Sequence, residues 1–317
     1  MGLLTTTVGW FPKPPALRRA RWQFAEGEIA EGPLREAESA ARSAAIAQQE
    51  SLGLDLLVDG QLERSDMITH FAERLAGLEI AGWVRCFDNR YYRKPRIVAD
   101  VRHAGPITVE AWQAARAATS KPLKAVITGP YTMMDWSFDE HYASREACCM
   151  ALAAAIRAEA EALLAAGAEE IEIDEPAISA RPEEIDLACR ALAHVTEPLR
   201  GKARSWTHVS YGEWEPVLDG LLRLPVDGLL LELTQSGHRV LPQLAALPAD
   251  KQLGLGVVDV LSEEVESSAA IRTRVERALR YVPAERLWLI PDGGLRCLSA
   301  QAAQDKLARL VEVAASF

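Results

Sequence analysis

Residues 228–260 read GLLLELTQSGHRVLPQLAALPADKQLGLGVVDV, and this stretch decides the fold class. Its two apolar runs, at 228–233 and 252–260, enclose a segment near 239–247 whose composition favours a short helix. Continuous apolar runs are typical of parallel strands that are buried on both faces, and parallel neighbours need a crossover between them. The stretch therefore predicts a βαβ unit of an α/β protein.

The same alternation of apolar runs and helical segments extends over the rest of the chain. The expected strands cover residues 3–9, 54–59, 121–128, 170–174, 203–210, 228–233, 252–260 and 286–290. The expected helices cover residues 34–52, 65–75, 109–118, 144–166, 182–196, 213–223, 239–247, 265–281 and 299–315. Each of the eight expected strands is followed by a helix. Eight such units favour a closed (β/α)8 TIM-type barrel over an open sheet.

One stretch interrupts this rhythm. Residues 80–104 read IAGWVRCFDNRYYRKPRIVADVRHA and are aromatic and basic, with a turn-prone Asp88-Asn89 pair. We expect a hairpin or a long insertion there, within a single barrel domain that spans residues 1–317. Just before it, Ser65 is the expected N-cap of the helix at 65–75, because a serine side chain can accept from the first backbone N–H groups of a helix.

Composition narrows the class of function. The 317 residues carry 35 Lys and Arg against 45 Asp and Glu, a formal net charge of −10, and no basic run that a nucleic-acid partner would need. No stretch approaches the roughly 18 consecutive apolar residues of a membrane span, and the first residues lack the features of a secretion signal. Five cysteines, an odd number, fit a reducing cytoplasm better than a disulfide framework. We expect a cytoplasmic protein with a small-molecule substrate; the oligomeric state stays open.

Polar residues collect at the carboxyl ends of the expected strands. Asp174, His208, Glu232, Asp259 and Asp292 all lie at or just beyond such an end. Because these ends meet at one mouth of a barrel, and because acids are rarely buried unless they are paired, the ring predicts a polar pocket. Any one of these residues could instead cap a helix or form a salt bridge within a loop.

Eight segments resemble, in order and spacing, the cobalamin-independent methionine synthase family. They are TTTVGWFP at 5–12, DGQLERSDM at 59–67, NRYYRKP at 89–95, TGPYTMMDWSF at 128–138, IEIDEPAI at 171–178, THVSYGEW at 207–214, GVVDVLS at 256–262 and PDGGL at 291–295. The match resembles the catalytic C-terminal half of that family and its short stand-alone members. The resemblance implies a TIM-type barrel and zinc-assisted transfer of a methyl group from methyltetrahydrofolate, or another methyl carrier, to a thiol such as homocysteine.

The resemblance also implies a zinc site that this sequence only half retains. The family takes its zinc ligands from a histidine and a cysteine two residues apart, a glutamate one strand later and a cysteine near the last strand. His208 and Glu232 occupy the first and third of these positions, and they are the expected ligands if any metal is bound. Ser210 and Gly293 occupy the two cysteine positions. Two ligands fall short of the three usual for catalytic zinc, so zinc is doubtful.

The positions that the resemblance assigns to the substrate amino acid have changed as well. Trp10 stands where the family has a serine near the substrate carboxylate, and Gln61 stands where it has a glutamate for the substrate ammonium. Trp136 and Asp174 are retained. We expect four residues to line the substrate site: Trp10, Gln61, Trp136 and Asp259. Asp259 is included because it is a polar residue at the end of its strand.

The resemblance and these departures from it together predict a divergent methionine-synthase-like methyltransferase that acts on a small molecule and has a degenerate zinc site. His208 is the expected general base, because its unperturbed pKa lies nearest neutrality, and Asp174 would orient it or neutralise the positive charge that develops. Glu232 and Tyr211 complete the expected catalytic group. Two alternatives stay open. One is a metal-free lyase or decarboxylase on the same barrel, and the other is a non-catalytic paralogue that binds a small molecule.

Overall fold

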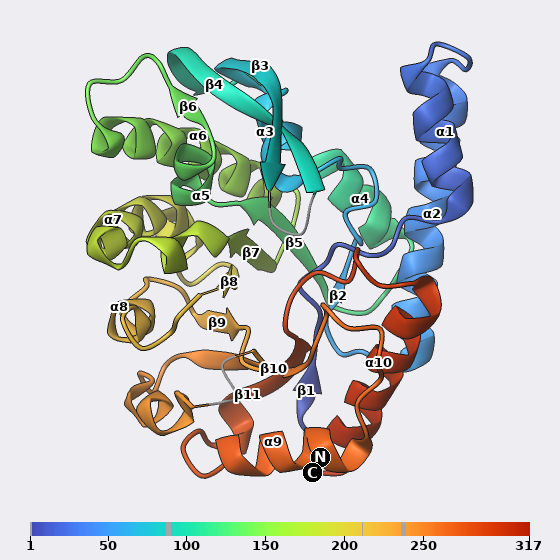
Figure 1. The fold of residues 1–317 in the computed structure, drawn as a ribbon, viewed down its shortest axis with the longest axis vertical. Coiled ribbons are helices and arrows are strands. Elements are labelled where there is room, and N and C mark those ends of the chain that lie inside the picture. Colours follow the sequence, from blue (N-terminus) through green and yellow to red (C-terminus); the bar gives the residue numbers. More distant parts are fainter. Residues whose placement is uncertain (1, 87–89, 211, 236–238) are drawn as a thin grey trace.

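The computed structural model describes residues 2–86, 90–210, 212–235 and 239–317, and it is an α/β barrel (Figure 1). Its eight-stranded parallel sheet has the order β1-β11-β10-β9-β8-β7-β5-β2. The strands are β1 (Leu4–Thr5), β2 (Leu57–Val58), β5 (Leu123–Thr128), β7 (Glu170–Asp174), β8 (Arg204–Val209), β9 (Gly228–Leu231), β10 (Gln252–Val258) and β11 (Leu287–Pro291). A parallel bridge between Thr6 and Leu56 joins the two ends of that order. The (β/α)8 prediction is confirmed.

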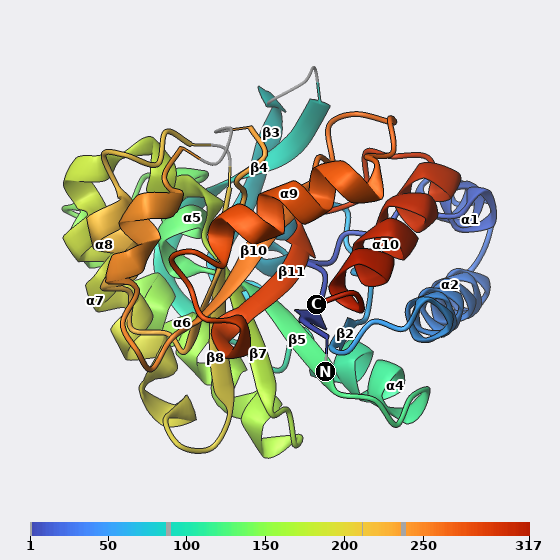
Figure 2. The same cartoon turned by 90° about the horizontal axis from the view of Figure 1, so that it is seen from below.

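Helices surround the strands on the outside (Figure 2). They are α1 (Pro15–Ala25), α2 (Glu31–Leu52), α3 (Met67–Ala72), α4 (Val109–Ala117), α5 (Pro130–Asp135), α6 (Arg145–Ala165), α7 (Ile185–Thr196), α8 (Leu218–Leu222), α9 (Ser268–Ala278) and α10 (Ala300–Ala314). In the described part of the chain, no helix is both long enough and apolar enough to cross a membrane.

Several local predictions need correction. The segment 239–247 forms a 3-10 helix, η5 (Leu241–Ala246), and the segment 213–223 contributes only the five residues of α8. Helices α1 and α5 were not expected; both begin with a proline, whose fixed φ suits the first turn. Ser65 is not the N-cap of α3: the side chain of Asp66 accepts from the N–H groups of Ile68 and Thr69 at 2.9 and 2.7 Å.

The stretch around 80–104 contains an antiparallel pair. Strand β3 (Leu75–Cys86) pairs with β4 (Arg90–His103), and β6 (Phe138–Asp139) adds to β4 in parallel. The pair lies at the top of the view in Figure 1, with α6 to its left and α1 to its right. The Tyr92 hydroxyl on β4 donates to the backbone oxygen of Trp136 at 3.1 Å, so the hairpin is tied to the loop that follows β5.

Strand register explains how the barrel interior is filled. Parallel partners on neighbouring strands present their side chains to the same face, and alternate residues of each strand share that face. The residues paired with Glu172 and Asp174 on β7 are Trp206 and His208 on β8. Packed within the barrel is an apolar cluster of Val8, Leu56, Trp206, Leu230, Trp288 and Ile290. Closer to the carboxyl ends of β7 and β8 lie the buried polar side chains of Asp174 and His208.

Candidate active site

Four buried polar side chains lie at the carboxyl ends of strands β7, β8, β9 and β11. Asp174 ends β7, His208 lies near the end of β8, Glu232 follows β9 and Asp292 follows β11. Each is at most 6% exposed. Between them on β10, Gly256 leaves space, since a Cβ there would lie 2.2 Å from the Asp292 carboxylate. The absence of that one side chain lets Asp292 reach toward β9.

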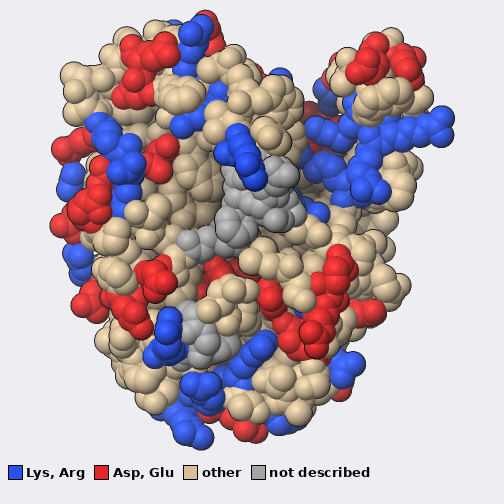
Figure 3. Space-filling model, in the orientation of Figure 1, with Lys and Arg blue, Asp and Glu red and all other residues tan. Residues whose placement is uncertain are grey.

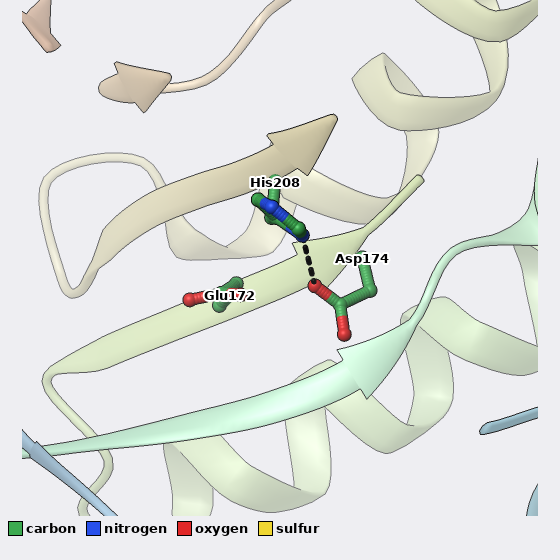
Figure 4. Close-up of side chains that lie close together, drawn as sticks. All are labelled: Glu172, Asp174 and His208. Carbon is green, nitrogen blue, oxygen red and sulfur yellow. Dashed lines mark ion pairs between the residues drawn. The ribbon is translucent and has the colours of Figure 1, made fainter. Parts of the chain in front are cut away.

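His208 lies between two acceptors, of which Figure 4 shows the Asp174 carboxylate. Its Nε2 atom is 3.2 Å from the backbone oxygen of Asp292, and its Nδ1 atom is 3.6 Å from a carboxylate oxygen of Asp174. A carbonyl oxygen only accepts, so Nε2 carries a hydrogen. The neutral ring therefore has its lone pair on Nδ1, facing Asp174. A proton taken up at Nδ1 completes an ion pair.

The surroundings of His208 favour its charged form. Burial alone opposes protonation of the ring. The Asp174 carboxylate, the charge of Glu172 and the Asp292 carbonyl outweigh that cost, and the pKa of His208 is raised above its ordinary value. A buried imidazole with a raised pKa is a stronger base than a free one and retains the proton once it has taken it.

Below this pair lies a buried ion pair that the sequence reasoning did not single out. Lys124 on β5 contacts Glu172 on β7, and both side chains are fully buried. The Lys124 ammonium also donates to the backbone oxygen of Thr7 at 2.9 Å. Burial raises the pKa of Glu172 to about 7, against the lowering effect of Lys124. Glu172, Asp174 and His208 bring ligand atoms within 4.8 Å of one another (Figure 4).

Asp292 is the second acid whose environment is unusual. One of its carboxylate oxygens accepts from the N–H groups of Leu233 and Thr234 at 3.1 and 3.3 Å, and the other is buried without a hydrogen-bond partner. Burial, with a further contribution from the charge of Glu232, raises the pKa of Asp292 to about 8. Near neutral pH this carboxyl group therefore holds a proton. Sequence reasoning placed Asp292 at a strand end but did not include it among the expected catalytic residues.

The donors near His208 differ from the four-ligand zinc set that the resemblance implies. The buried Ser210 offers a hydroxyl and Gly293 offers no side chain where that set has thiolates. Cys148 and Cys149 are buried near the start of α6, and burial raises the pKa of both thiols. Glu172 already has Lys124 as its counter-charge. The described ligand atoms that lie together here belong to Glu172, Asp174 and His208, and none of them is a thiolate of the kind found in the four-ligand zinc set.

Trp10 and Gln61 contact each other rather than standing apart in the mouth. The Gln61 side-chain oxygen accepts from the Trp10 backbone N–H at 2.9 Å. Both residues have left-handed φ values, 53° and 54°, which are uncommon for side-chain-bearing residues and concentrate at functional sites. The Gln61 oxygen is thus committed to holding the turn after β1.

The other residues predicted for the site do not all lie beside His208. Trp136 is partly buried against the core at the end of α5. The Asp259 carboxylate accepts from the Leu261 N–H at 2.7 Å, which makes it part of its own turn. Tyr211 lies outside the described residues. The structure brings His208, Asp174, Glu232 and Asp292 to one layer at the strand ends. The Asp259 side chain instead stabilises its own loop.

Comparison with known proteins adds an independent finding. Residues 3–316 match the family profile described as cobalamin-independent synthase, catalytic domain. The methionine synthase of Saccharolobus solfataricus is 35% identical over 312 residues, which cover 98% of this chain and 93% of the relative. The 5-methyltetrahydropteroyltriglutamate–homocysteine methyltransferase of Synechococcus sp. is 35% identical over 304 residues, 93% of this chain but 40% of the relative.

Solved structures agree with these sequence matches. A B12-independent methionine synthase from Shewanella sp., in complex with selenomethionine, superposes with a TM-score of 0.88 at 26% identity and covers 100% of this chain and 97% of that one. A Listeria monocytogenes protein, described as a vitamin-B12 independent methionine synthase, has a TM-score of 0.81 at 20% identity over 99% and 98% of the two chains. The second match bears on the fold alone.

Proposed function

The chain belongs to the cobalamin-independent methionine synthase family, and from this premise we propose that it is a methyltransferase whose site works without a zinc thiolate. The methyl donor is a methyltetrahydropteroyl compound of the kind named for the longer relatives, or another methyl carrier. The acceptor is a small molecule whose nucleophilic atom gives up its proton to the protein.

The transfer requires one proton acceptor and one proton donor. The acceptor atom loses its proton to Nδ1 of His208 and forms a bond to the methyl carbon. The bond between that carbon and the carrier breaks, its electron pair stays on the carrier, and the carrier gains a proton. Asp292, whose carboxyl group is protonated near neutrality, is positioned in the same layer to supply that proton.

Asp174 and Glu172 stabilise the charge that forms on His208. The Asp174 carboxylate faces Nδ1 at 3.6 Å, and Glu172 lies beneath both. Because the site is buried, the attraction between imidazolium and carboxylate is screened less than it would be in water. Glu232, close enough to raise the pKa of Asp292, helps to keep that carboxyl group protonated.

One observation carries the proposal most directly: His208 has its Nε2 atom on the Asp292 carbonyl and its Nδ1 atom facing Asp174. The carbonyl oxygen therefore holds Nε2, and Nδ1, which is 3.6 Å from Asp174 and beyond hydrogen-bond length, is the nitrogen left to take up a proton. Ser210 and Gly293, at the positions where the resemblance implies thiolates, supply no alternative means of activating a thiol.

Binding of the methyl donor tests the proposal against its alternatives. We expect calorimetry to detect binding of 5-methyltetrahydrofolate to the full chain, and mass spectrometry to detect a methylated acceptor when a panel of small thiols, amines and alcohols is added. Donor binding without product from any acceptor would point to a non-catalytic binding protein. No donor binding, together with release of carbon dioxide from a carboxylated ligand, would replace methyl transfer with a lyase reaction.

A further inference from the structure

The rim of the barrel beside Trp10 is built from two loops in close contact. The loop after β11 passes so near Trp10 that a Cβ on Gly294 would lie 2.6 Å from the Trp10 Cβ. On the other side, the N–H of Phe11 donates to the Gly60 oxygen at 3.0 Å, which fixes the loop after β1 to the loop after β2. Contacts on both sides therefore hold Trp10 in place. Gly294, which lies against Trp10, is two residues after Asp292 in the chain.

Two cations accompany the Trp10 ring. The Lys13 ammonium lies 5.8 Å from the ring centroid and the Arg296 guanidinium lies 5.2 Å from it. Lys13 stands between Pro12 and Pro14, whose rings restrict the backbone, and its ammonium donates to the Arg64 backbone oxygen at 2.8 Å. The Lys13 ammonium is thus held in place, and Arg296 is an exposed side chain in the loop after β11.

Nearby acids do not fully balance these charges. Glu38 is bound to Arg21 at 3.0 Å and Asp59 lies 3.8 Å from Arg64. The charge of Glu63 also acts on Lys13, and both Glu63 carboxylate oxygens are buried without a hydrogen-bond partner. Within the described ranges, neither Lys13 nor Arg296 forms an ion pair with a carboxylate. Lys and Arg side chains also gather along the arm formed by α1 and α2 (Figure 3).

Burial and two neighbouring cations act on the pKa of Lys13 in the same direction. Burial lowers it first, and repulsion by Arg21 and Arg296 lowers it further, to about 8 despite the opposing effect of Glu63 and Glu38. A bound anion would relieve that repulsion. The neutral Gln61 is the contrasting neighbour: its side-chain oxygen is held by Trp10, and it brings no negative charge for an ammonium group.

From this geometry we propose that Lys13 and Arg296, on either loop beside Trp10, form a subsite for a carboxylate of the bound small molecule, and that this molecule needs no ammonium group. The inference rests on the proposed function for the class of reaction, and it adds the charge of the substrate. The carboxylate belongs either to the methyl acceptor or to the glutamate tail of the donor.

Equilibrium binding to the full chain tests the subsite with probes matched in pairs. For the acceptor, 4-mercaptobutyrate keeps the carboxylate and lacks the amino group of homocysteine, and 1-propanethiol lacks both. For the donor, 5-methyltetrahydrofolate is compared with one and with three glutamates. We expect Lys13→Met and Arg296→Met each to weaken binding of the carboxylate-bearing probe about tenfold, as for loss of a charge-assisted hydrogen bond, and to leave 1-propanethiol unaffected.

Arg19→Met is the matched control, because Arg19 is an exposed cation on α1 outside the subsite. A loss confined to 4-mercaptobutyrate assigns the carboxylate to the acceptor, and a loss confined to the triglutamate donor assigns it to the donor. Unchanged affinities, or an equal loss in Arg19→Met, would overturn the subsite. Because the readout is binding, it stands apart from turnover: methyl transfer with unchanged affinities defeats only the subsite, and a confirmed subsite without methyl transfer defeats only the proposed function.

Discussion

At the scale of single residues, His208 controls the proton in the proposed reaction. Its removal in His208→Ala takes away the group that accepts the proton, and general-base catalysis typically contributes 10²- to 10⁴-fold to a rate. We expect kcat for methyl transfer to fall by about that factor. His141→Ala, at a half-exposed histidine paired with Asp100 on the outside of the fold, is the control and should leave kcat unchanged. Equal activity of both variants would remove His208 from the mechanism.

Asp174 sets the pH dependence of the same residue. The base must be neutral to act, so kcat/KM should rise with pH through the pKa of His208, which is raised above 6.5. In Asp174→Asn the opposing carboxylate is gone and burial then dominates, so the midpoint of the profile should move to lower pH. A pH–rate profile of both proteins checks the direction. A midpoint that stays in place or moves up would contradict the ion pair as its cause.

Lys124 and Glu172 are expected to act as a unit. Lys124→Met leaves the Glu172 carboxylate buried without its counter-charge, which costs about 3–5 kcal/mol of the free energy of unfolding. Lys124→Met combined with Glu172→Gln removes both charges and should recover much of that loss. Urea unfolding of the two single variants and the double variant measures the coupling. Additive losses would show that the two side chains do not interact in the folded protein.

Residue-level prediction from the sequence succeeded where a strand end fixes a side chain. Asp174, His208 and Glu232 were placed at one mouth because consecutive strand ends converge. Glu172 was missed, although it lies two residues before Asp174 and alternation along a strand puts both on the same face. Its partner Lys124 sits 48 residues earlier along the chain, and only the pairing of β5 with β7 brings them together.

At the scale of elements, the start of α3 separates two neighbouring capping residues. Asp66 accepts from two N–H groups of the first turn, whereas Ser65 does not cap the helix. We expect Asp66→Ala to lower the free energy of unfolding by about 1 kcal/mol and Ser65→Ala to leave it nearly unchanged. Chemical denaturation of both variants distinguishes them. A larger effect at Ser65 would contradict the observed cap.

Long periodic elements were predictable and short ones were not. The helices α2, α6 and α10 and the strand β7 match their predicted ranges closely, because each carries a full apolar face or run. Helix α5 has six residues, too few to show a period, and it is held by tertiary contacts: Glu175 accepts from the N–H groups of Tyr131 and Thr132 at 3.0 and 2.7 Å. Such a helix cannot be identified from local sequence.

At the scale of the whole molecule, the barrel gathers residues from distant parts of the chain into one layer. The fold followed from the number and order of βα units, and the family matches agree with it. The division into one domain with an insertion at about 80–104 stays a prediction. The positions of the cysteines in the chain are more informative than their number. The two positions after β8 and β11 where the resemblance implies cysteine ligands hold Ser210 and Gly293.

The central claim is that methyl transfer here depends on His208 and its acids and not on a zinc thiolate. The most direct test measures zinc content and methyl transfer on the same sample of the full chain, before and after dialysis against a chelator. We predict far less than one zinc per chain and unchanged transfer after dialysis. One tightly held zinc per chain, whose removal abolishes transfer and whose return restores it, would contradict the account.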